Sequence, residues 1–170
     1  MSTLANRFIG SVRLRAESYE EIEADRKANW QAVTVVLLSS LAAAIGTGMT
    51  NVLGLTILLL FALATWISWV LLALVIGTEV LPGRETKVDF GQLFRTTGFS
   101  AAPGIFRALG FFPTVGWLIF LGATIWMLFS FVVAIRQALD FTNTQRAVAV
   151  CLLGWLIHGM LFFGFLMTAY

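Results

Sequence analysis

The chain has 170 residues, of which 59% are hydrophobic and 12% are charged, whereas about 25% of a soluble domain is charged. Too few polar groups remain to cover a globule in water, so the composition excludes an ordinary soluble domain and predicts a membrane protein. The net charge of +2 includes no basic run that would suggest a nucleic-acid partner, and the single cysteine, Cys151, excludes an internal disulfide bond.

Residues 1–29 carry most of the charge, and we expect them to form a cytoplasmic arm. Apolar residues recur at helical spacing from Leu4 to Ala16 with arginines between them, which predicts a short amphipathic helix. This helix could lie on an anionic membrane surface or pack on the protein's own cytoplasmic face. Ser18 and Glu21 match a capping box and predict a second helix after Ser18. The arm has no apolar core of signal-peptide length, so the first span is expected to act as its own insertion signal.

No charge occurs between Ala28 and Thr78. As one helix this run would be about 75 Å long, more than twice the hydrocarbon core of about 30 Å, so it must fold back on itself. Glycine and asparagine residues just before and at Asn51 mark the turn. The first two spans are therefore predicted at residues 30–48 and 52–81.

Ser40, Ala44 and Gly48 form a row of small residues along one face of the first span. Such rows let two helices approach closely in lipid, so we expect intramolecular packing here, with self-dimerisation as the alternative. Trp66 and Trp69 of the second span fall near mid-depth. They could fill the interior of the bundle or line a pocket for a pigment or a lipid.

Residues 97–113 are apolar except for Arg107, but they are few for a complete span. This third segment is predicted either to cross the membrane with length borrowed from a preceding helical stripe, at Phe90, Leu93, Phe94 and Thr97, or to be re-entrant. Arg107 lies close enough to the outer interface to snorkel. It could instead cap a neighbouring helix, or it could bind an anion or a substrate, because an arginine within the membrane is costly without a partner.

The last two spans are predicted at residues 115–135 and 147–168, and a short polar connection joins them. His158, the only histidine, lies near the centre of the fifth span. At this depth it is a candidate axial ligand for a heme or a chlorin, or a proton relay, and the alternative is an interhelical hydrogen bond. A pigment ligand would have tryptophans around it, at Trp66, Trp69 or Trp155.

The distribution of lysine and arginine predicts the orientation of the chain. With five spans and a cytoplasmic N-terminus, ten of the eleven basic residues lie on the cytoplasmic side. The outer loops near Asn51 and Pro113 then have none, whereas four spans would move Arg136 and Arg146 outside. We therefore expect a multi-pass protein of the cytoplasmic (inner) membrane with its C-terminus outside.

Three sequence elements, in this order and spacing, resemble the Yip (Ypt-interacting protein) domain family. They are Ser18-Tyr-Glu-Glu-Ile22 with Ala24-Asp25, then Gly98-Phe99-Ser100-Ala-Ala-Pro103, and finally Arg136-Gln-Ala-Leu followed by Gln145-Arg146-Ala147. The resemblance covers nearly the whole chain and implies a five-span helical protein with a cytoplasmic N-terminus. Eukaryotic members are tied to vesicle traffic of the Golgi and endoplasmic reticulum and to prenylated small GTPases.

Those eukaryotic members have a long arm and an Asp-Leu-Tyr-Gly-Pro element that this chain lacks, so a small GTPase is not expected as a partner. The short form resembles bacterial members, whose activity the resemblance does not define. The expected fold is an all-α polytopic transmembrane helical bundle of five spans (residues 30–170), preceded by amphipathic cytoplasmic helices.

The sequence contains no phosphate-binding glycine loop, metal-ligand cluster or nucleophile–base pair. We therefore expect a non-enzymatic scaffold or accessory subunit without metal or cofactor, whose partners are the lipid bilayer and other membrane protein subunits. The alternatives are a pigment- or heme-binding subunit with His158 as ligand, a membrane-traffic adaptor as in the family, and a small transporter with Arg107 near its mouth.

Overall fold

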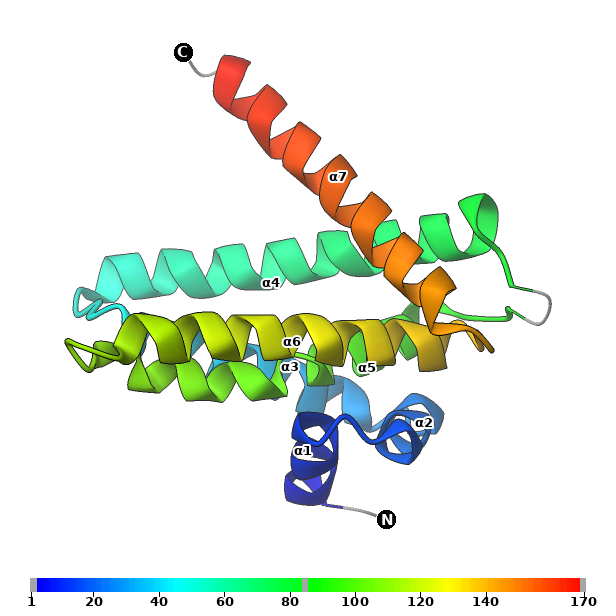
Figure 1. The fold of residues 1–170 in the computed structure, drawn as a ribbon, viewed down its shortest axis with the longest axis horizontal. Helices are drawn as coiled ribbons and strands as arrows, with labels where there is room; N and C mark the ends of the chain where they lie inside the picture. Colours follow the sequence, from blue (N-terminus) through cyan, green and yellow to red (C-terminus); the bar gives the residue numbers. More distant parts are fainter. Residues whose placement is uncertain (1–2, 84–85, 169–170) are drawn as a thin grey trace.

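The computed structural model describes residues 3–83 and 86–168, with side chains described as far as Met160, and within these residues it is helical without any strand (Figure 1). The elements in chain order are α1 (Leu4–Val12), α2 (Ala16–Ala24), α3 (Ala28–Gly46), α4 (Val52–Val75), the π-helical turn η1 (Ile76–Val80), α5 (Phe90–Phe99), the 3₁₀ helix η2 (Ala102–Phe111), α6 (Gly116–Ala138) and α7 (Thr144–Thr168).

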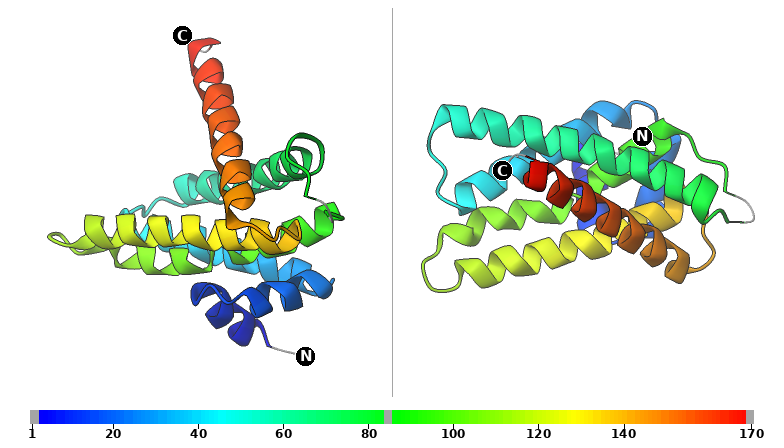
Figure 2. Two further views of the ribbon diagram at one scale, coloured as in Figure 1. Left: turned by 45° about the vertical axis from the view of Figure 1, so that its right-hand side comes forward. Right: turned by 90° about the horizontal axis from the view of Figure 1, so that it is seen from above.

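Four apolar segments, namely α3, α4, α5 with η2, and α6, lie side by side and form the bundle (Figures 1 and 2). Local sequence signals begin two of them: the Asn51 side chain accepts a hydrogen bond from the Gly54 backbone at the start of α4, and Asp89 with Gln92 forms a capping box at the start of α5. Such caps satisfy backbone N–H groups that have no partner within the helix.

Three continuous helices among the described residues are long and apolar enough to cross a membrane: Ala28–Gly46, Val52–Val80 and Gly116–Ala138. They coincide with the predicted first, second and fourth spans to within three residues at each end. The chain is therefore a membrane protein of the all-α class with several apolar helices. The total of five crossings stays a prediction.

The third predicted span is not one helix over residues 97–113. It begins earlier, at Phe90, and changes from α5 to the 3₁₀ helix η2 after Phe99. Pro103 explains the change, because it has no backbone N–H to donate to the Phe99 carbonyl and its ring disfavours a continuous α-helix. Together α5 and η2 cover residues 90–111 and lie along α3 and α6.

The N-terminal arm packs against the bundle. Leu4, Phe8 and Val12 of α1 contact the hydrophobic core, which favours the second of the two predicted placements for this helix. The predicted start of the second helix after Ser18 is wrong, because α2 begins at Ala16 with Arg15 as its N-cap.

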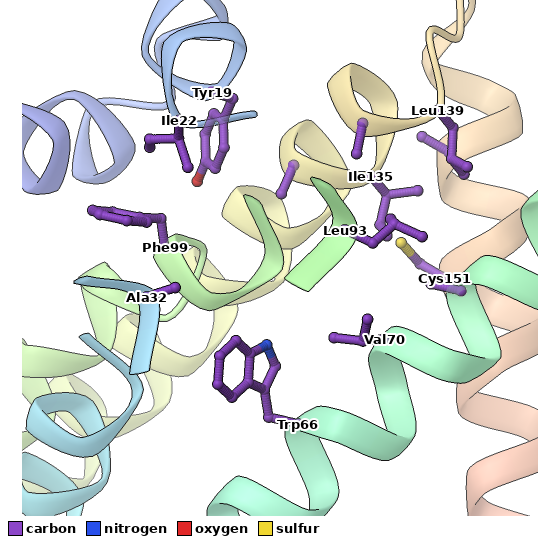
Figure 3. Packing of buried hydrophobic residues seen from close by; sticks show 14 of the residues in the cluster. Tyr19, Ile22, Ala32, Trp66, Val70, Leu93, Phe99, Ile135, Leu139 and Cys151 are labelled. Carbon is purple, nitrogen blue, oxygen red and sulfur yellow. The ribbon is translucent and has the colours of Figure 1, made fainter. Parts of the chain in front are cut away.

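Residues from both ends of the chain meet in the core, as Figure 3 shows. Tyr19 and Ile22 of α2 are fully buried, and the Tyr19 hydroxyl lies 2.6 Å from Oγ of Ser130 in α6. The largest other buried side chains there come from α5, from α6 and from the C-cap of α6, namely Leu93, Phe99, Ile135 and Leu139. Burying a large apolar side chain away from water stabilises the folded state by roughly 1.5–3 kcal/mol. The buried side chains of α2 therefore hold the arm on the end of the bundle that faces water.

Helix α7 crosses the bundle and then diverges from it (Figures 1 and 2). At the crossing, a Cβ atom on Gly154 would lie 2.4 Å from the Trp69 ring of α4, so the missing side chain allows the two helices to touch. Beyond this point α7 diverges from the neighbouring helices (Figure 1).

Candidate ligand site in the membrane domain

A pocket of about 360 Å³ lies inside the bundle, and residues of α3, α4, α5, η2, α6 and α7 line it. Four residues singled out from the sequence meet here, namely Trp66, Trp69, Arg107 and Trp155, and Ser40 of the predicted packing row also lines it. Helical membrane proteins build ligand sites between helices in this way. The pocket has an aromatic part and one cationic side chain.

Arg107 is the cationic side chain of the pocket, and it turns toward α3. Its Nη2 donates to the carbonyl oxygen and to Oγ of Ser39, at 3.0 and 2.8 Å, and its Nε donates to the Gly104 carbonyl at 3.3 Å. The guanidinium carbon lies 5.6 Å from the ring centre of Phe120, within range of a cation–π interaction. In the part of the chain that the structure describes, Nη1 donates no hydrogen bond.

Arg107 reaches Ser39 because η2 and α3 approach each other with their backbones in contact. A Cβ atom on Gly46 would lie 1.9 Å from the Arg107 carbonyl oxygen, and one on Gly104 would lie 2.0 Å from Oγ of Ser39. Gly110 also lies against the backbone of Gly46. Glycines on both helices therefore set the position of the guanidinium in the pocket.

Three tryptophans and two phenylalanines form the aromatic part of the pocket. Nε1 of Trp66 donates to Oγ1 of Thr97 at 3.0 Å, which satisfies its only polar atom. Trp69 meets the edges of Phe131 and Trp155, with ring centres 5.4 and 6.3 Å apart. These contacts fix the rings that line the pocket.

His158 lies behind Trp69. The rings of His158 and Trp69 stack with their centres 5.5 Å apart and their planes inclined by 16°. Trp69 also contacts Trp155, so the three predicted residues form one cluster. Nδ1 of His158 is buried and has no hydrogen-bond partner among the described residues. The role of His158 as a heme or chlorin ligand stays a prediction.

The Gly98-Phe99-Ser100-Ala-Ala-Pro103 element has a packing role at each of its four defining positions. Gly98 lets α5 touch α3 and α4, because its Cβ would lie 2.7 Å from both Ala32 and the Trp66 ring. Phe99 is fully buried, and Oγ of Ser100 donates to the Thr97 carbonyl at 2.6 Å. Pro103 then begins the 3₁₀ helix, so this element shapes the floor of the pocket.

The predicted row of small residues on α3 is only partly a packing row. Ser40 and Ala44 are buried, at 8% and 2% exposure. Gly48 lies two residues beyond the end of α3 with φ of +72°, and no heavy atom lies within 4 Å of where its Cβ would be. Gly48 therefore serves the turn, where a positive φ favours glycine, and Gly46 makes the close helix contact instead.

The hydroxyl groups in the pocket already bond to their own helices. Oγ of Ser40 donates to the Val36 carbonyl at 2.8 Å, and Oγ1 of Thr97 donates to the Leu93 carbonyl at 2.6 Å. No three His, Cys, Asp or Glu side chains come close enough to hold a metal ion within the described ranges. The arrangement is suited to binding an amphiphilic ligand by its shape and by the charge of Arg107.

Two buried arginines that the sequence does not single out join the arm to the bundle. Arg95 of α5, at 4% exposure, donates to the carbonyl oxygens of Ile22 and Glu23 in the last turn of α2 and to Oδ1 of Asn29. Arg7 of α1 pairs with two carboxylates and with one amide, namely Glu21 at 3.3 Å, Asp25 at 2.7 Å and Gln31 at 2.9 Å. The guanidinium of Arg7 in turn holds the pKa of Asp25 below its usual value.

Glu23, at the cytoplasmic end of α2, titrates near neutral pH. Burial raises the pKa of Glu23 from 4.5 to about 7, and the nearby carboxylate of Asp140 contributes to the increase. The positive charge of Arg95 acts in the opposite direction but is outweighed. Nε2 of Gln92 donates to Oε1 of Glu23 at 2.9 Å. The charged form of Glu23 is therefore less favourable in the folded protein than in the unfolded chain.

We expect Glu23→Gln to remove a pH dependence of stability. The folded protein holds the Glu23 proton more tightly, so stability falls as the pH rises from about 4.5 to about 7 and is level above that. Glutamine cannot ionise and keeps an oxygen that accepts from Gln92, so the stability of the variant relative to the parent protein should rise between about pH 4.5 and about pH 7 and stay constant above that. Thermal unfolding in detergent at about pH 5 and pH 8 measures this, and identical pH profiles for the two proteins would contradict it.

The sequence matches the family model of the Yip1 domain over residues 9–166, which is nearly the whole chain. No curated protein and no solved structure matches it.

Proposed function

The chain belongs to the Yip1 domain family, and from this premise we propose that it is a non-enzymatic scaffold or accessory subunit of a larger membrane complex. The proposal needs a surface that receives another membrane protein and an interior that binds without chemical change. Both requirements are supported by the arrangement of the helices.

The exposed apolar side chains of α7 are the observation that carries the proposal. On α7, Leu156 is 61% exposed and Met160 is 67% exposed, and on α6, Phe129 is 60% exposed. Helix α7 touches α4 at Gly154 and then diverges from the bundle (Figure 1), and these apolar side chains are left uncovered by the protein's own helices. Helices in lipid associate through close packing, so an apolar helix of a partner protein can pack on these side chains.

The proposed orientation places the N-terminal arm in the cytoplasm. The charge distribution supports this, because the arm and the loops on its side hold ten of the eleven basic residues. With five crossings of the inner membrane, single cysteines at Asn51 and Asn143, in a Cys151→Ala background, should be labelled from opposite sides. Labelling of both from the same side, by a reagent that does not cross the membrane, would refute this topology.

Photo-crosslinking tests the proposed interface. A benzophenone amino acid at Leu156 and, separately, at Phe129 should capture the same protein, in similar amount, from intact membranes. The same probe at Leu41 of α3, which is 38% exposed but lies away from α7, is the control and should capture mainly lipid.

The captured protein must then depend on this chain for its own assembly. We expect deletion of the chain to shift that partner from a large to a smaller species in native electrophoresis. A scatter of unrelated proteins captured at Leu156, or a partner whose assembly is unchanged, would rule out the accessory-subunit role.

A further inference from the structure

The positive charge of Arg107 has no acidic partner among the residues that the structure describes. All nine acidic residues lie at positions 17–25, 79–89 and 140, so none occurs in α3, α4, α5, η2, α6 or α7. A guanidinium in an apolar environment is costly unless an anion neutralises it. The groups that its guanidinium contacts are neutral: Ser39, the Gly104 carbonyl and the ring of Phe120.

These neutral contacts orient the guanidinium without saturating it. Nη2 and Nε are engaged, whereas Nη1 donates to no group in the described part of the chain. Arg107 also lines the pocket, so a ligand there can reach this side chain. An acceptor bearing negative charge would supply both the missing hydrogen bond and the missing counter-charge.

The rest of the pocket selects an apolar chain as the remainder of that ligand. Leu58, Phe61, Trp69 and Phe131 are among its lining residues. Phe61 is also 60% exposed, so the pocket reaches the outer surface of the bundle where acyl chains of the bilayer lie. An acyl chain can enter from the lipid at this point without crossing water.

We propose that this pocket binds a long-chain carboxylate of the fatty-acid class, with its carboxylate at Arg107 and its chain among the aromatic rings. Ser39, which holds the guanidinium, lies seven residues before the end of α3, a distance of about 10 Å along the helix. A single-chain carboxylate can bind at that depth, whereas the phosphate of a bilayer phospholipid stays at the level of the headgroups. The proposal is independent of the scaffold role.

Energy transfer from tryptophan to a polyene fatty acid provides the test. The full chain is purified in an uncharged detergent at about pH 9, above the carboxylate pKa of about 4.3, and titrated with cis-parinaric acid and separately with its methyl ester. Trp66, Trp69 and Trp155 line the pocket, so a bound polyene quenches their emission. The acid should bind at least about tenfold more tightly than the ester, as expected for one charge-assisted hydrogen bond.

Variants assign the preference to Arg107. Arg107→Met should abolish the difference between acid and ester, and Arg107→Lys should keep part of it. Arg13→Met removes an exposed arginine of the arm, away from the pocket, and should keep the full difference. If Arg107→Met does not yield a folded protein, the acid–ester comparison on the parent chain and the Arg107→Lys variant still decide.

Equal binding of acid and ester by the parent protein overturns the proposal, as does unchanged acid binding by folded Arg107→Met. Competition separates the two possible sources of an anionic group. Displacement of the acid by phosphatidylglycerol, but not by phosphatidylcholine, would assign the site to a phospholipid and overturn the single-chain proposal. Displacement by unlabelled palmitate alone supports it.

Discussion

Replacing Gly46 with alanine is expected to destabilise the protein by about 3 kcal/mol or more and to displace Arg107 from the pocket. The added Cβ would lie 1.9 Å from the carbonyl oxygen of Arg107, which is a backbone atom that cannot move by rotation of a side chain. Helices α3 and η2 must therefore separate, and overpacking of this kind costs typically about 1–3 kcal/mol, occasionally more. Separation also lengthens the hydrogen bonds from Arg107 to Ser39.

The matched control for this variant is Gly122→Ala. Gly122 also lies inside a helix, α6, but nothing lies within 4 Å of where its Cβ would be. Alanine there should stabilise the helix by roughly 0.5–1 kcal/mol. Thermal unfolding in the same detergent measures both variants, and equal shifts for the two would show that close contact at Gly46 does not govern stability.

Replacing Arg95 with methionine is expected to release the arm from the bundle. Arg95 acts as a C-terminal cap of α2, because it donates to the carbonyl oxygens of Ile22 and Glu23, and its charge is favourable at that end of the helix dipole. Hydrogen bonds to a charged group contribute roughly 1.5–3 kcal/mol each, and without Arg95 the Ile22 carbonyl keeps only the long bond from the Asp25 backbone N–H, at 3.4 Å. We expect a loss of about 3 kcal/mol.

Limited proteolysis by an enzyme that cleaves after glutamate reports the release of the arm. Glu20 and Glu21 lie in α2, which Tyr19 and Ile22 fix to the bundle, so cleavage at these sites should be slow in the parent protein and fast in Arg95→Met. Arg13→Met, which removes an exposed charge from the same arm, should leave the cleavage rate unchanged. Protection of α2 in Arg95→Met would show that burial of Tyr19 and Ile22 alone holds it.

The apolar segments could be predicted from the sequence because length and hydropathy are local properties. The second span, predicted at 52–81, corresponds to α4 with η1 over Val52–Val80, and the turn before it is set by Asn51. The helical stripe that begins at Phe90 predicts α5, and Asp89 with Gln92 caps this helix, but the stripe does not predict the change to a 3₁₀ helix after Phe99. The effect of Pro103 on the helix type depends on packing around Gly98 as well, and no local pattern encodes that.

The candidate site could be predicted only as separate residues. Trp66 and Trp69 lie near the middle of an apolar segment, and Arg107 is a charged residue within one, so each is a candidate functional residue from the sequence alone. Their common pocket depends on contacts between residues far apart in the sequence, such as the 68 positions that separate Ser39 from Arg107. Arg7 and Arg95 gave no signal, because an arginine near a membrane boundary ordinarily faces the headgroups or water.

The contact between Tyr19 and Ser130 has a consequence for the biosynthesis of the protein. The two residues are 111 positions apart, so at roughly 5–20 residues per second the ribosome needs about 5–20 seconds to synthesise Ser130 after Tyr19. Until α6 has been inserted, Tyr19 and Ile22 have no complete binding surface and remain accessible to chaperones and proteases. Docking of the first-made helices therefore marks a late stage of maturation, and nascent chains arrested before α6 should be degraded from the N-terminal end.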